Sequence, residues 1–190
     1  MPIYKSTRPS VSVPTAGQYF FTTSPANAAT SATLSNAVLR LSPWVVERSL
    51  NIDRIGAEIT AVGDAGSKLR IGIYADNGAC LPGALLLDAG TIAGDSATVQ
   101  DIALGTTLAL PSGLYWVGGA VQVVTTTQPT VRVQSNWTPP VPLPGGTSAP
   151  GSGATHVCVF QNTGVTGALP ALFTYAGTTS PAPRIHVRAA

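Results

Sequence analysis

Apolar and polar side chains alternate along much of this chain, which is the period of a β-strand with one buried face. In residues 54–61, the apolar face would hold Ile55, Ala57, Ile59 and Ala61, and the polar face Arg54, Glu58 and Thr60. In residues 68–76, the apolar face would hold Leu69, Ile71, Ile73 and Ala75, and the other face Lys68, Arg70, Tyr74 and Asp76. Both segments are therefore predicted to be strands that cover a core.

The segments between such strands carry the residues of tight turns. Residues 63–67 separate the two strands above, and the pattern predicts that these strands form a hairpin. Asn77-Gly78 and Pro82-Gly83 mark a second compact reversal. Further extended segments follow up to residue 188, whereas helix signals are nearly absent. The predicted fold is all-β, an antiparallel β-sandwich that is jelly-roll-like.

Residues 1–25 differ from the rest because four prolines lie among serine and threonine there. Proline fixes φ and removes a backbone donor, so this segment is predicted to be an extended N-terminal arm. Ile3, Tyr4, Val11 and Val13 would be costly to leave in water. Two interpretations stay open: a flexible terminus, or an assembly arm that lies along a neighbouring subunit.

A Pro/Gly-rich stretch, residues 138–153, has the composition of a linker. Only 37 residues follow it, too few for an independent core, so the later strands are expected to complete the sheets begun earlier. Residues 26–190 are therefore predicted to be one β-sandwich domain, with 138–153 as a long contact loop.

Charge and hydropathy narrow the choice of partners. Charged residues make up 9% of the chain, and the arginines are too dispersed to neutralise several phosphates together, so nucleic-acid binding is not expected. The mean hydropathy is +0.27, yet no apolar run is long enough for a membrane span. The apolar excess favours contacts with copies of the chain or with other subunits.

The N-terminal sequence indicates the compartment of synthesis. No apolar run follows Lys5 and Arg8, so a secretory signal is not expected and synthesis in a cytoplasm follows. Cys80 and Cys158 are then expected to be reduced rather than paired.

Motifs that carry chemistry are scarce. There is no G-x-S-x-G elbow, no C-x-x-C or H-x-x-x-H spacing and no phosphate-binding glycine motif. His156 and His186 are expected to face solvent, and the sequence Asp76-Asn77-Gly78 is explained as a turn. We therefore expect no catalytic residue, no metal and no cofactor.

Aromatic side chains are the remaining candidates for binding. Trp116 lies in a strongly apolar segment followed by Gly118-Gly119, whose missing side chains would make room for it in the core. Trp137 stands at the border of the Pro/Gly-rich stretch, where a contact role and simple anchoring are both open. Trp137, Tyr74 and Asn77 are the predicted surface-contact residues.

One part of the chain, roughly residues 37–135, resembles the β-sandwich domains of minor tail and tail-fibre proteins of bacteriophages that infect actinobacteria. The matching features are KLRIGIYADNGACLPGALLLDAGTI, which begins at Lys68, and LPSGLYWVGGAVQ, which begins at Leu110. The resemblance implies a sandwich fold and a role in the virion. It does not distinguish tail tips, fibres, head fibres and capsid decoration, because sandwiches of this kind serve in all of them.

The leading interpretation is a non-enzymatic bacteriophage virion structural protein of the minor tail or tail-fibre type. It is expected to form a homotrimer, to assemble with other virion proteins and to contact the host surface. The alternatives are a capsid decoration or head-fibre protein and a carbohydrate-binding module for a host surface glycan. A depolymerase has the least support, because no residue pattern indicates a catalytic pair.

Overall fold

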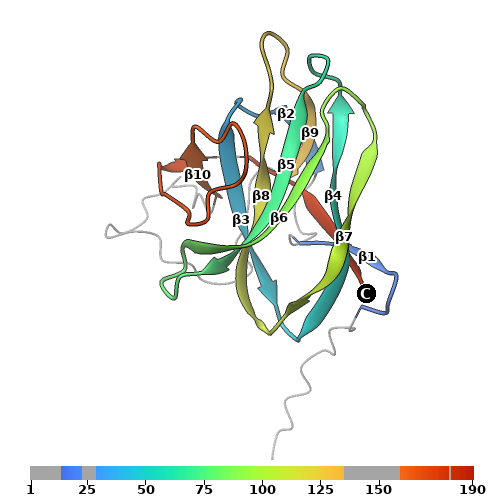
Figure 1. Ribbon diagram of the computed structural model, residues 1–190, viewed down its shortest axis with the longest axis vertical. Helices are drawn as coiled ribbons and strands as arrows, with labels where there is room; N and C mark the ends of the chain where they lie inside the picture. Colours follow the sequence, from blue (N-terminus) through green and yellow to red (C-terminus); the bar gives the residue numbers. More distant parts are fainter. Residues whose placement is uncertain (1–13, 23–28, 135–158, 180) are drawn as a thin grey trace, which may run out of the picture.

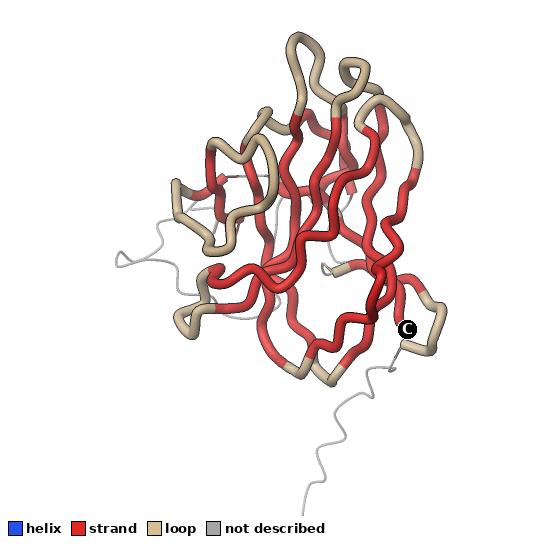
Figure 2. Tube along the Cα trace, in the orientation of Figure 1, coloured by secondary structure: helices blue, strands red, loops and turns tan. Residues whose placement is uncertain are grey.

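The computed structural model describes residues 14–22, 29–134, 159–179 and 181–190, and these residues form strands, turns and loops without a helix (Figure 2). Two antiparallel sheets pack together as a β-sandwich (Figure 1). This architecture confirms the antiparallel sandwich that the period-two pattern predicts.

The larger sheet has seven strands, and its centre is a long strand, β4, which pairs with β7, β13 and β9. Beyond them, β1 pairs with β13, and β2 and β12 pair with β9. The bounds are β1 (Tyr19–Phe21), β2 (Ala29–Thr33), β4 (Leu50–Ala61), β7 (Val99–Leu110), β9 (Thr130–Gln134), β12 (Ala182–Pro183) and β13 (Ile185–Ala189).

The smaller sheet has six strands in the order β11-β10-β3-β8-β5-β6. Their bounds are β3 (Val38–Val46), β5 (Lys68–Asp76), β6 (Pro82–Ala93), β8 (Gly113–Gln122), β10 (Val159–Thr163) and β11 (Thr178–Thr179). Strands β10 to β13 follow the Pro/Gly-rich stretch in the sequence and join both sheets. The stretch itself, 138–153, lies outside the described residues.

The predicted hairpin at residues 63–67 is wrong. Strand β4 belongs to the seven-stranded sheet and β5 to the six-stranded sheet, so this turn carries the chain across the sandwich. Both strands do place their alternate apolar residues in the shared core, with Ile55 and Ile59 facing Ile71 and Ile73. Alternation identifies the buried face of each strand, but it does not say whether two consecutive strands pair with each other or face each other across a core.

Two apolar clusters stabilise the molecule. The larger cluster fills the space between the sheets and includes Trp44 and Tyr115. The smaller cluster covers the outer face of the six-stranded sheet, where Trp116 and Tyr74 pack beneath a loop segment that contributes Val165, Leu169 and Phe173. The six-stranded sheet is therefore buried on both faces, which explains why Trp116 is fully buried, as the sequence predicts.

The segment predicted as an arm contributes to the sheet at its C-terminal end. Strand β1 pairs with β13 in the register Tyr19 to Arg188, Phe20 to Val187 and Phe21 to His186. The Gly17 amide also donates to the carbonyl of Ala189, beside the C-terminus. Residues 1–13, with Ile3, Tyr4, Val11 and Val13, lie outside the described residues.

Candidate functional site

A hollow among the described residues lies on the outer face of the seven-stranded sheet. Four strands supply it, because the pairing registers align Phe21 of β1, His186 of β13, Gly56 of β4 and Asp101 of β7 in one row across the sheet. These residues are between 35 and 165 positions apart in the chain, as their numbers in the sequence give. Only the antiparallel register brings them together.

Gly56 makes this arrangement possible. A Cβ atom at this position would lie 2.6 Å from His186 Nε2 and 2.8 Å from Asp101 Oδ1. It would also lie 2.0 Å from the carbonyl oxygen of Gln100. Because glycine has no side chain, the His186 imidazole crosses over β4 at this point and reaches the carboxylate on β7.

Asp101 is the centre of the polar groups in the hollow. Its Oδ1 lies 2.5 Å from His186 Nε2, and its Oδ2 accepts a hydrogen bond of 2.5 Å from the Tyr19 hydroxyl. Burial raises the pKa of Asp101, but the hydrogen bonds from Tyr19 and His186 outweigh burial, and the pKa is lower than usual. The hydrogen bond between Tyr19 and Asp101 also raises the pKa of the Tyr19 hydroxyl. Both oxygens of Asp101 are thus already engaged, and Tyr19 remains a protonated donor.

The hollow is an open groove of about 430 Å³ lined by Tyr19, Phe20, Phe21, Val99, Asp101 and His186. Its walls are apolar and unusually accessible, since Tyr19, Phe21 and Val99 are 50%, 49% and 61% exposed. Large apolar side chains exposed together in a hollow indicate a contact site more than isolated ones do. We call these six residues the β1 groove.

Arginine side chains surround the β1 groove. The Arg184 guanidinium lies 4.0 Å from the centre of the Phe21 ring, and that of Arg188 lies 5.9 Å from the centre of the Tyr19 ring. Arg188 is paired with Asp53, and Arg184 lies 3.8 Å from a carboxylate oxygen of Glu58. These guanidinium groups lie against the aromatic walls of the groove, where they make cation–π contacts.

The prediction that Tyr74 is a surface-contact residue is wrong. Its side chain is fully buried in the smaller cluster, and its hydroxyl donates to the carbonyl of Pro170 at 2.9 Å. The alternation placed it on the outer face of β5 correctly, but that face is covered by the loop segment at Leu169. Burial also raises the pKa of Tyr74 well above its usual value.

The other predicted residues are either exposed or not described. Asn77 is exposed in the turn between β5 and β6, where its side-chain oxygen accepts the Ala79 amide at 2.8 Å. Asp76 accepts hydrogen bonds from the Trp116 indole and the Gly78 amide, which explains this sequence as a structural turn. Trp137 lies outside the described residues, as do Cys158 and His156. Cys80 is a free thiol.

The sequence analysis missed the groove residues on β7 and β13. His186 was expected to face solvent; its side chain does lie on the outer face, but Tyr19 and Phe21 pack against it and leave it buried. The available signal was the Tyr19-Phe20-Phe21 triplet, an aromatic run that a flexible terminus would not favour.

Comparison with known proteins assigns this chain to no family, so the β-sandwich fold is the class of protein that the structure defines. No protein-family model matches this chain. No curated protein matches it either. Within residues 14–22, 29–134, 159–179 and 181–190, no group of three or more His, Cys, Asp or Glu side chains could hold a metal ion. Among those same residues, no helix is long and apolar enough to cross a membrane.

Proposed function

We propose that this chain is a non-enzymatic structural protein of a bacteriophage virion, of the minor tail or tail-fibre type, which acts in assembly and host-surface contact. The observation that carries the contact role is the β1 groove, where Tyr19, Phe21 and Val99 are about half exposed in one hollow. The sequence resemblance over residues 37–135, which spans β3 to β9, supports the virion as the location.

The chemistry of the groove favours contact over catalysis. A catalytic acid or base needs a free proton or lone pair directed at a substrate. In the β1 groove, both oxygens of Asp101 are occupied by Tyr19 and His186, and the walls are apolar. The groove offers surface for burial, and burial of apolar area stabilises association.

Assembly also accounts for the low charge of the chain. Four arginine–carboxylate ion pairs among the described residues link segments within one sheet, among them Arg70 with Asp88 and Arg132 with Glu58. Much of the remaining surface is neutral, and neutral surface carries a smaller desolvation cost when subunits meet. We propose that the chain forms a homotrimer and contacts other virion proteins.

Two other functions remain candidates. A capsid decoration or head-fibre protein would use the same groove on the head rather than the tail. A carbohydrate-binding module for a host surface glycan is favoured by the two half-exposed rings of Tyr19 and Phe21, since aromatic faces stack on sugar rings.

The test is to locate the chain on particles. Antibodies raised against the purified chain would be applied to virions of the phage that encodes it, and gold labels would be scored on tail and head by electron microscopy. Label at the tail supports the proposal, and label on the head supports decoration. Particles without label, and without the chain in their mass spectrum, would refute both.

A further inference from the structure

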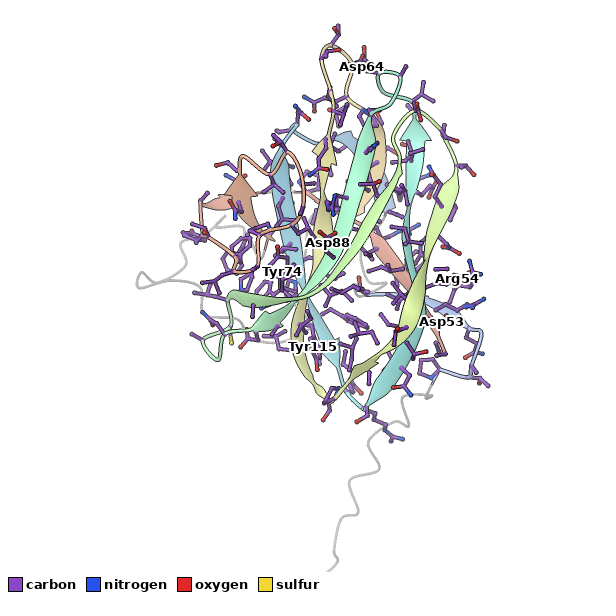
Figure 3. All side chains as sticks on the ribbon, in the orientation of Figure 1. Asp53, Arg54, Asp64, Tyr74, Asp88 and Tyr115 are labelled. Carbon is purple, nitrogen blue, oxygen red and sulfur yellow. The ribbon has the colours of Figure 1, made fainter. Side chains whose placement is uncertain are left out.

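The strongest unexplained feature beside the β1 groove is the cation Arg54. It lies on β4 in the row next to Gly56, where the register aligns Tyr19, Arg188, Arg54 and Ala103. Its charge acts on neighbouring groups: it contributes to the lowered pKa of Asp53 and Asp101, and it opposes the rise in the pKa of Tyr19 that the hydrogen bond to Asp101 causes. In Figure 3, Arg54 lies beside Asp53 at the right-hand margin of the molecule.

Arg54 has no carboxylate partner within the chain. All eight Asp and Glu side chains belong to the described residues. The ion pairs that these residues form join Asp53 to Arg188, Glu58 to Arg132 and Arg184, Asp88 to Arg70, and Asp101 to His186. The Arg54 Nε is also buried without an acceptor in the described structure. A buried guanidinium N–H without an acceptor is costly, and an external anion bound to the Arg54 guanidinium would offset that cost.

The free edge of strand β1 is a third feature of this surface. Strand β1 is the terminal strand beyond β13, so in the described structure one of its edges has no neighbouring strand. An extended peptide can pair with such an edge through its main chain while its side chains enter adjacent hollows. The β1 groove would accept one large apolar side chain between Phe21 and Val99, and Arg54 would face a neighbouring carboxylate.

We propose that the β1 groove binds an extended acidic segment of a different protein, which places an apolar side chain against Phe21 and Val99 and a carboxylate on Arg54. A second copy of this chain fits less well, because four of its carboxylates are held in ion pairs and Asp64 is bound by three backbone amides. The inference rests on the proposed assembly function and names the chemistry of the partner.

The probe is a short synthetic peptide, acetyl-Glu-Asp-Leu-Phe-Asp-Glu-amide, titrated into the full-length chain with methyl-labelled valine. Two matched peptides are the controls, one with lysine in place of every acidic residue and one with serine in place of Leu and Phe. We expect saturable shifts of the Val99 methyl signals with the acidic apolar peptide. Both control peptides should bind at least tenfold more weakly.

Variants of the chain separate this groove from general charge attraction. Arg54→Glu and Val99→Ser should each weaken binding of the acidic peptide at least tenfold. Arg48→Glu, an exposed arginine outside the groove, and Val62→Ser, an exposed valine in the turn after β4, should leave it within twofold. Unchanged thermal unfolding of all four variants would show that the fold is intact.

The binding experiment can fail without contradicting the proposed function, because its outcomes test only the partner of the groove. Equal binding of the acidic and basic peptides, or no saturation up to about 5 mM peptide, would overturn the inference. If the molar mass rises with protein concentration and falls on Val99→Ser, the occupant of the groove would be a second copy of this chain instead of an acidic segment. If an acidic polysaccharide shifts the Val99 methyl signals and none of the peptides does, the ligand of the groove would be a glycan instead of an acidic protein segment. In each case, labelling of virions would still decide the proposed function by itself.

Discussion

At the scale of single residues, glycines decide how closely the strands of this sandwich approach. A Cβ at Gly118 would lie 1.9 Å from the Arg40 carbonyl oxygen, and one at Gly119 would lie 2.5 Å from the Arg70 carbonyl oxygen. These two glycines of β8 therefore make room for the backbones of β3 and β5. Trp116, which precedes them on the same strand, is in the core as predicted.

Gly56 has the same steric role and also shapes the groove, so Gly56→Ala should lower the free energy of unfolding by about 1–3 kcal/mol. The added methyl would collide with the Gln100 carbonyl and with His186. Urea unfolding followed by tryptophan fluorescence measures the change.

The matched control for this substitution is Gly105→Ala, on β7, where a Cβ would have no heavy atom within 4 Å. We expect its stability to be unchanged or slightly higher, since alanine restricts the unfolded chain more than glycine does. Equal stability of the two variants would contradict the close approach at Gly56.

At the scale of elements, the turn that carries the chain from β4 to β5 is held by one carboxylate. Asp64 accepts hydrogen bonds from the backbone amides of Thr125, Thr126 and Thr127, and from the Thr125 hydroxyl. These bonds hold the pKa of Asp64 far below its usual value of 3.8. The loop after β8 and the crossing turn are thereby joined at one end of the sandwich, where Figure 3 labels Asp64.

A depressed pKa stabilises the fold at pH values above the unfolded pKa of about 3.8, and this contribution is lost as the pH falls below it. Asp64→Asn should therefore destabilise the chain at pH 7, and the difference from the wild type should shrink steadily below pH 4. Urea unfolding at several pH values from 2.5 to 7 would measure it. Asp95→Asn, which neutralises a carboxylate that accepts a single amide hydrogen bond from Gly66, should have the smaller effect at pH 7. A difference that stays constant over the whole pH range would contradict the account.

The segment between β10 and β11 is a second element whose contribution can be measured. Leu169 is buried against the six-stranded sheet, and a Cβ on Gly72 would lie only 2.2 Å from its Cδ1 atom. Leu169→Ala should lower the free energy of unfolding by about 2–5 kcal/mol because it opens a cavity in the smaller cluster.

Leu172→Ala is the control on the same segment, because Leu172 is 66% exposed. Its effect should stay within about 0.5 kcal/mol. If both leucine variants were equally stable in thermal and urea unfolding, this segment would not be the cover of a second core.

At the scale of the whole molecule, the sequence predicts the class of fold better than its connections. Alternation at Ile55 and Ile71 located strands and their core-facing sides, which depends only on local spacing. Whether β4 pairs with β5 depends on which sheet each strand joins, and this non-local choice leaves no mark in the alternation. The burial of Tyr74 has the same origin, since the segment that covers it lies about 95 residues later, at Leu169.

The groove was even less accessible to sequence reasoning. It joins residues from β1, β13, β4 and β7, and a shift of one residue in any register would turn His186 or Asp101 to the other face. Its central residue, Gly56, acts through an absent side chain. A histidine, an aspartate and a glycine in three distant strands give no recognisable spacing, so the site became visible only with the pairing registers.

The central claim is that this sandwich is a component of a phage particle, and the direct measurement is quantitative mass spectrometry of purified virions of the encoding phage, combined with gold labelling. The account predicts that the chain is present at a fixed copy number per particle, with label at the tail. Purified, infectious particles that lack the chain would contradict it.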